Sequence, residues 1–79
     1  MKNEMYKIKD LQIASTIYAL GEKFASSEWD NGVCFLYFEE KEKCEQICRK
    51  YFSGELKVDP RVLFDSYKTL KSIIFNSKM

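Results

Sequence analysis

Three cysteines are the most reactive side chains of this sequence, and two of them are spaced to share one face of a helix. Cys44 and Cys48 lie four residues apart, and Cys34 belongs to a strand-like segment before them. Converging thiolates can bind a metal or carry redox chemistry, but structural zinc usually takes four ligands. A free cysteine commonly packs as a small apolar side chain. We therefore expect the cysteines to pack in the core, with a metal or redox site as the alternative.

A second chemical candidate is a group of glutamates at the junction of a strand pattern and a helix pattern. Its members are Glu39, Glu40, Glu42 and Glu45. Paired carboxylates can bind a divalent cation or exchange protons with a substrate. The interleaved Lys41 and Lys43 instead indicate a solvated first helical turn, where glutamates interact favourably with the helix dipole. We therefore expect these glutamates to form a solvated helix start and not a binding or catalytic site.

The chain contains no histidine. This excludes catalytic triads that use histidine, histidine acid–base catalysis and histidine metal sites. Neither the GxxxxGK[ST] nor the GxGxxG phosphate-binding pattern occurs. We therefore expect a protein that is not an enzyme, with no catalytic residue, no cofactor and no metal.

The composition predicts one small folded domain, residues 1–79. Of the 79 residues, 46% are hydrophobic and 15% aromatic, which is typical of a globular chain. The net charge is +1, but residues 49–79 hold seven basic and three acidic residues and are net +4.

No apolar run approaches the roughly 20 residues that span a bilayer. The opening residues lack the apolar core of a secretory signal, and three cysteines without a CxxC pair suit a reducing compartment. We expect a cytoplasmic protein that makes no membrane contact.

Local signals predict an α+β fold in the order β-α-β-β-α-α, with a β-hairpin packed against three helices. Residues 6–9 alternate apolar and charged side chains and would extend the hairpin to a three-stranded sheet. Helices are expected at 11–20 after Asp10, from residue 40 to Gly54, and at 60–75 after Asp59. The hairpin strands are expected at 22–30 and 33–39, around an Asn31-Gly32 turn.

This turn predicts which side chains share each face of the hairpin. With Asn31 and Gly32 at its centre, Trp29 opposes Cys34 and Ala25 opposes Phe38, on a face that is nearly all apolar. The other face collects further apolar and polar residues. From it we take four candidate protein-binding residues: Phe24, Glu28, Phe35 and Tyr37. Three other roles remain open for the aromatic residues of this set. They could stack on nucleic-acid bases, pack in a homodimer, or be covered by the connector before the last helix.

The last helix offers an alternative site. Its apolar stripe is expected to contain Leu63, Tyr67, Leu70 and Ile74, widened by Val62, Phe64, Ile73 and Phe75. Its polar side carries the candidate nucleic-acid-binding residues Arg61, Lys68, Lys71 and, just beyond the helix, Lys78. Cations at this spacing suit contacts with a phosphate backbone, and they also suit ordinary solvation.

The segments YKIKDLQIASTIYALG, DNGVCFLYFEEKEKCEQICRKYFSGE and VDPRVLFDSYKTLKSIIF, in this order, resemble a family of short bacterial and phage proteins that is defined only as a domain of unknown function. The resemblance covers nearly the whole chain. It rests on Lys9, Asp10, Leu11, Ala14, Gly21, Phe38, Glu39, Tyr51, Gly54, Glu55, Leu70, Lys71, Ile74 and Phe75. It departs at the Asp-Asn-Gly turn and at Glu39-Glu40, where Glu-Asp is more usual. The resemblance implies an accessory protein of phages or other mobile elements.

Together these observations favour a small non-enzymatic protein that binds a protein partner, with inhibition of a host defence factor as one specific form. Nucleic-acid binding by the basic C-terminal helix is the alternative function. The partner's identity and the oligomeric state, including a homodimer, stay open.

Overall fold

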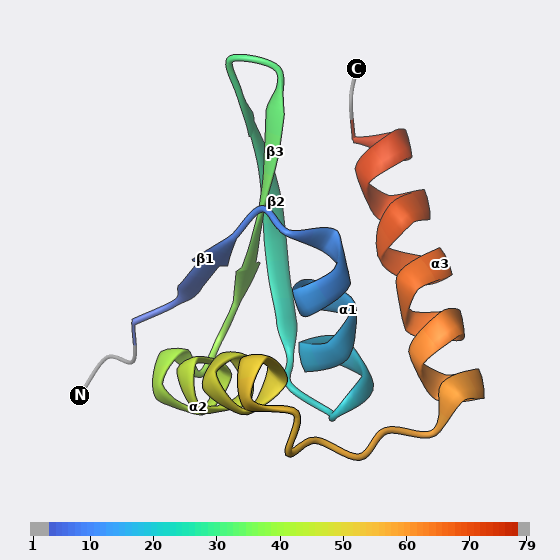
Figure 1. Cartoon of the computed structure of the whole chain (residues 1–79). Helices are drawn as coiled ribbons and strands as arrows, with labels where there is room; N and C mark the ends of the chain where they lie inside the picture. The colour runs from blue at the N-terminus through green and yellow to red at the C-terminus, as the bar shows by residue number, and fades with distance from the viewer. Residues whose placement is uncertain (1–3, 78–79) are drawn as a thin grey trace.

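The computed structural model describes residues 4–77, which form a three-stranded antiparallel sheet with three helices packed on one of its faces (Figure 1). The elements are β1 (Tyr6–Ile8), α1 (Leu11–Ala19), β2 (Phe24–Asp30), β3 (Val33–Phe38), α2 (Lys41–Ser53) and α3 (Pro60–Asn76). β3 lies between β1 and β2 in the sheet. The predicted fold class, order of elements and third strand are confirmed.

α1 and α3 begin where the local signals predict, while β2 begins at Phe24, two residues after its expected start. Asp10 caps α1 by accepting hydrogen bonds from the backbone amides of Gln12 and Ile13, at 2.9 and 3.1 Å. Asp59 caps α3 in the same way through the amide of Arg61, at 2.9 Å. These carboxylates satisfy amides that have no partner within the helix.

The hairpin turn and the end of α2 both need a backbone with positive φ. The hairpin turn has φ 52° at Asn31 and 79° at Gly32, the combination that a two-residue turn of this hand needs. α2 ends at Gly54 with φ 75°, in the left-handed conformation that glycine adopts without steric penalty.

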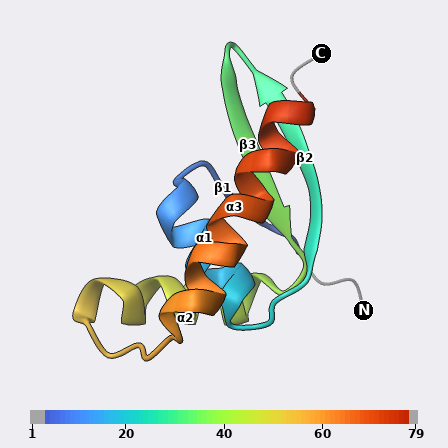
Figure 2. The same ribbon diagram turned by 90° about the vertical axis from the view of Figure 1, so that its right-hand side faces the viewer.

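The core lies where β3 meets α1. Its buried apolar side chains are Ile13, Ala14, Ile17, Leu36, Phe38, Cys44 and Leu70. α1 is the central helix, since α2 and α3 both pack on it, and α2 also contacts β1. Figure 2 shows α3 lying over α1, with the hairpin behind. This arrangement explains why α1 is buried over most of its circumference, as its apolar sequence predicts.

One predicted strand register is wrong at its far end. From Asp30 opposite Val33 to Ser26 opposite Tyr37 the pairing is regular, but an irregularity between Phe24 and Ser26 then places Phe24, not Ala25, opposite Phe38. An extra residue in one strand reverses the direction of the side chains beyond it. Phe24 therefore turns to the core face, where its ring meets that of Phe38 edge to face with centroids 5.7 Å apart.

We expect Phe24→Ala to destabilise the protein more than Phe35→Ala. Phe24 packs on the core, so its loss should lower the free energy of unfolding by about 2 kcal/mol. Phe35 lies on the opposite face, and its loss should cost at most about 1 kcal/mol. Urea unfolding followed by circular dichroism measures both values. Equal losses would contradict the register described here.

Candidate interaction surfaces

The open face of the sheet brings together three of the four predicted protein-binding residues. Glu28 lies opposite Phe35 in the hairpin, and the Tyr37 hydroxyl donates a hydrogen bond of 2.8 Å to Glu28 Oε1. This hydrogen bond raises the pKa of Tyr37. Phe24 is absent from this face, because the irregularity in β2 turns it to the core. Within residues 4–77 no helix packs on the open face (Figure 1).

The aromatic rings of the open face already have partners within the chain. Lys7, which lies opposite Tyr37, places its Nζ 4.4 Å from the centroid of the Phe35 ring. Phe35 and Tyr37 are both half-buried. Lys7 thus covers the Phe35 ring, and the Tyr37 hydroxyl is hydrogen-bonded to Glu28. A partner on this face would compete with these contacts, which exist in the free protein.

The side of α3 that faces away from α1 differs from the sequence expectation. Leu70 and Ser66 are buried, and Leu63, Ile73 and Ile74 are half-buried, so the buried stripe of α3 is narrow. The predicted core residues Val62, Phe64, Tyr67 and Phe75 are exposed, Phe64 by 68% and Phe75 by 78%. Among the described elements α1 alone packs extensively on α3, and one helix cannot cover the wide apolar surface that the sequence pattern describes.

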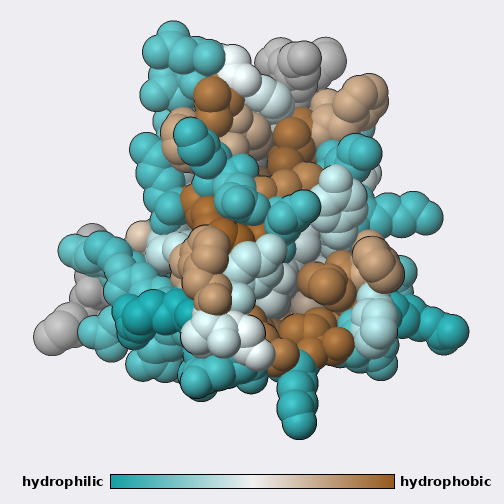
Figure 3. Space-filling model, viewed as in Figure 1, coloured by the Kyte–Doolittle hydropathy of each residue, from teal (hydrophilic) through white to brown (hydrophobic). Residues whose placement is uncertain are grey.

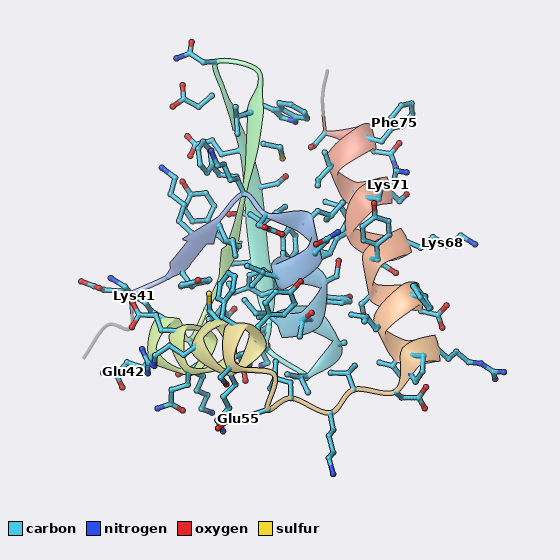
Figure 4. All side chains as sticks on the ribbon, viewed as in Figure 1. Lys41, Glu42, Glu55, Lys68, Lys71 and Phe75 are labelled. Atoms are coloured by element: carbon cyan, nitrogen blue, oxygen red, sulfur yellow. The ribbon has the colours of Figure 1, made fainter. Side chains whose placement is uncertain are left out.

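Phe64 and Phe75 share this side of α3 with the predicted cations. A helix turns about 100° per residue, so residues 61, 64, 68, 71 and 75 fall within one narrow sector. We call this set, Arg61, Phe64, Lys68, Lys71 and Phe75, the outer stripe of α3. Figure 4 shows Lys68 and Phe75 projecting away from the sheet. The fourth predicted cation, Lys78, lies outside the described residues.

The outer stripe is positively charged and has an aromatic margin. It carries three cations, whereas the whole of α3 contains a single acidic residue, Asp65. Lys71 Nζ lies 5.8 Å from the centroid of the Tyr67 ring, so the two side chains form a contact on the edge of the stripe.

A groove lies beside the outer stripe, between α3, α1 and the end of α2. Its volume is about 470 Å³, and its lining residues are Gln12, Ser15, Thr16, Tyr51, Leu63, Phe64 and Tyr67. Figure 3 shows apolar side chains at the surface between α2 and α3. Phe64 belongs both to the groove and to the outer stripe, so the two form one continuous surface.

The sequence contains a signal for this surface. Positions 61, 64, 68, 71 and 75 follow the same three-and-four spacing as positions 63, 66, 70 and 73, which are buried or half-buried. An apolar pattern alone does not say which of two such stripes faces the core. The cations between Phe64 and Phe75 mark their stripe as the solvated one.

The cysteines have the environment of core residues. Cys44 is fully buried, and Cys34 and Cys48 are half-buried free thiols. Burial raises the pKa of the Cys44 thiol to about 11, and the carboxylates of Glu22 and Glu40 add to this shift. Burial also raises the pKa of Cys34.

The predicted glutamate group surrounds the start of α2. Glu39 and Glu42 are exposed and Glu40 and Glu45 are half-buried. Lys41, in the same segment, binds Glu4 Oε1 at 3.0 Å and so ties the chain before β1 to α2 (Figure 4). Over the described range, no three cysteine, aspartate or glutamate side chains are grouped so that they could hold a metal ion.

Comparisons with known proteins add no identification. No protein-family model, curated protein or solved structure matches the chain. The resemblance to the family of short bacterial and phage proteins therefore stays a prediction. Across residues 4–77, none of the helices has the length and apolar character needed to cross a membrane.

We expect the Cys44 thiol to be unreactive in the folded protein. In a Cys34→Ala, Cys48→Ala variant Cys44 is the sole thiol, and iodoacetamide at about pH 8 should modify it far more slowly in buffer than in urea. Modification requires an accessible thiolate, whereas Cys44 is buried and has a raised pKa. Mass spectrometry measures the rate. Equal rates in buffer and in urea, with folding verified by circular dichroism, would contradict the core assignment.

Proposed function

We propose that this protein is a non-enzymatic binding protein that contacts a protein partner through the outer stripe of α3 and the adjoining groove. The observation that carries the proposal is the exposure of Phe64 and Phe75 on the outer stripe, together with the groove that Phe64 itself lines. Single exposed apolar residues are common on protein surfaces. Here Val62, Tyr67 and the two phenylalanines are exposed along one helix.

The composition of this surface favours a protein partner. Aromatic residues and arginine are enriched in protein–protein interfaces, and the strongest contacts are typically aromatic or arginine side chains next to a pocket. The open sheet face, which holds Glu28, Phe35 and Tyr37, is the weaker candidate because its rings are engaged by Lys7 and Glu28. An accessory role in a phage or mobile element, with inhibition of a host defence factor as one form, is proposed from the family resemblance alone.

Nucleic-acid binding is the second candidate, and one observation favours it. Phe64 and Phe75 are exposed among Arg61, Lys68 and Lys71, and single-strand-binding proteins combine cations with rings on which bases stack. The groove favours a protein instead, since its aromatic and aliphatic walls offer a pocket for an apolar side chain and its volume lies within the range of binding clefts.

We expect affinity purification of the tagged protein from the cells that produce it to recover a partner that resists nuclease. A Phe64→Gln, Phe75→Gln variant should lose this partner, because the anchoring rings are removed while glutamine keeps the helix propensity. Quantitative mass spectrometry of the recovered proteins makes the comparison.

The matched control is a Phe35→Thr, Tyr37→Thr variant, which alters the open sheet face and keeps strand propensity. It should retain the partner. Loss of the partner in this variant alone would move the interface to the sheet, and release of all recovered material by nuclease would favour the nucleic-acid function. Circular dichroism and urea unfolding verify that each variant is folded.

A further inference from the structure

The groove beside α3 has a mainly apolar surface, although Gln12, Ser15, Thr16 and the two tyrosines that line it carry polar groups. The Ser15 hydroxyl donates to the Leu11 carbonyl at 2.7 Å, and the Thr16 hydroxyl donates to the Gln12 carbonyl at 3.0 Å. Among the described residues, every buried side-chain nitrogen or oxygen atom has a hydrogen-bond partner. The groove therefore leaves no buried polar group for a ligand to satisfy, and an apolar side chain suits it best.

The charge beside the groove selects an acidic occupant. Arg61, Lys68 and Lys71 extend along α3 over 10 positions, or about 15 Å. Opposite charges across an interface favour encounter and fix orientation, while a basic partner would be repelled. The same repulsion disfavours a second copy of this chain that places its own α3 against the stripe.

The walls of the groove indicate the conformation of the occupant. They are formed by α1, α2 and α3, so they offer no strand edge to which an extended peptide could hydrogen-bond. A chain buried against helices must satisfy its own backbone groups, and an α-helix does so. Phe64 and Phe75 are about 16 Å apart along α3, so roughly three turns of a helix would cover both.

We infer that the partner contributes an acidic amphipathic α-helix, which lies along the outer stripe of α3 and inserts an apolar side chain into the groove. This inference rests on the protein-binding function proposed above and specifies the chemistry of the partner. The apolar face of the helix covers Phe64 and Phe75. Its flanking carboxylates face Arg61, Lys68 and Lys71.

The probe for this inference is a fluorescein-labelled peptide of about 18 residues, long enough to cover the stripe, with leucines at heptad spacing and glutamates on the flanks. One control peptide has the same composition in shuffled order without an apolar face. Another has lysine in place of glutamate. Fluorescence anisotropy with the full chain measures binding, at low salt and at about 0.15 M salt.

We expect the acidic amphipathic peptide to bind and both control peptides to bind at least about tenfold more weakly. Phe64→Gln, Phe75→Gln should weaken binding about tenfold or more at both salt concentrations. Lys68→Glu, Lys71→Glu should weaken it about tenfold and remove most of its salt dependence. The charge-matched control Lys43→Glu, Lys50→Glu changes exposed residues of α2 and should alter binding by less than about twofold.

Three results would overturn the inference: no binding of the acidic peptide up to about 1 mM, equal binding of the shuffled peptide, or affinity unaffected by the α3 variants. Preferential binding of a labelled single-stranded oligonucleotide, or of anionic lipid vesicles, through Lys68 and Lys71 would replace it. If the peptide fails while affinity purification still recovers a partner that depends on Phe64 and Phe75, the proposed function stands and only the acidic-helix inference falls.

Discussion

The hydrophobic core that β3 and α1 share is the feature on which the rest of this structure depends. Leu36 and Phe38 of β3 and Ile17 of α1 belong to one core cluster, and all three side chains are fully buried. β3 is also the strand to which both neighbours hydrogen-bond, and α1 is the helix on which both other helices pack. In a chain of this size only about 60% of the unfolded surface can be buried, so one such centre must organise every element.

A single centre leaves other surfaces uncovered, and this produces the two candidate interaction surfaces. The three helices gather on the face of the sheet that carries Leu36 and Phe38. Within residues 4–77 the opposite face is covered by its own side chains, which pair as Lys7 with Phe35 and Tyr37 with Glu28. α3 is 17 residues long and rests mainly on α1, which has 9 residues, so much of its circumference faces outward.

The proposed function is binding rather than reaction, and the environments of several described residues support this proposal. Cys44 is buried with a raised pKa, and the hydroxyls that line the groove are engaged by the backbone of their own helix. The outer stripe, by contrast, exposes the rings of Phe64 and Phe75, with Lys68 and Lys71 between them. Contact between a surface of aromatic rings and cations and an apolar, acidic partner is favourable without any covalent bond being made or broken.

The sequence by itself determined the features that depend on neighbouring residues. The caps at Asp10 and Asp59, the hairpin turn at Asn31-Gly32 and the end of α2 at Gly54 were all predictable, because each depends on the backbone preferences and side-chain reach of a few adjacent residues. The fold class followed, since these boundaries fix the order and length of the elements. Of the candidate protein-binding residues, Glu28, Phe35 and Tyr37 were placed together correctly for the same reason.

Only the tertiary structure decided the rest. The irregularity beside Ala25 turns Phe24 toward Phe38, and nothing in the local sequence requires an extra residue at that point of the strand. The choice between two equally spaced stripes of α3 is decided by the packing of α1 against Ser66 and Leu70, which leaves Phe64 and Phe75 outside. Burial is a property of residues distant in the sequence, so an apolar periodicity predicts that a helix forms but not how much of its surface the remaining chain can cover.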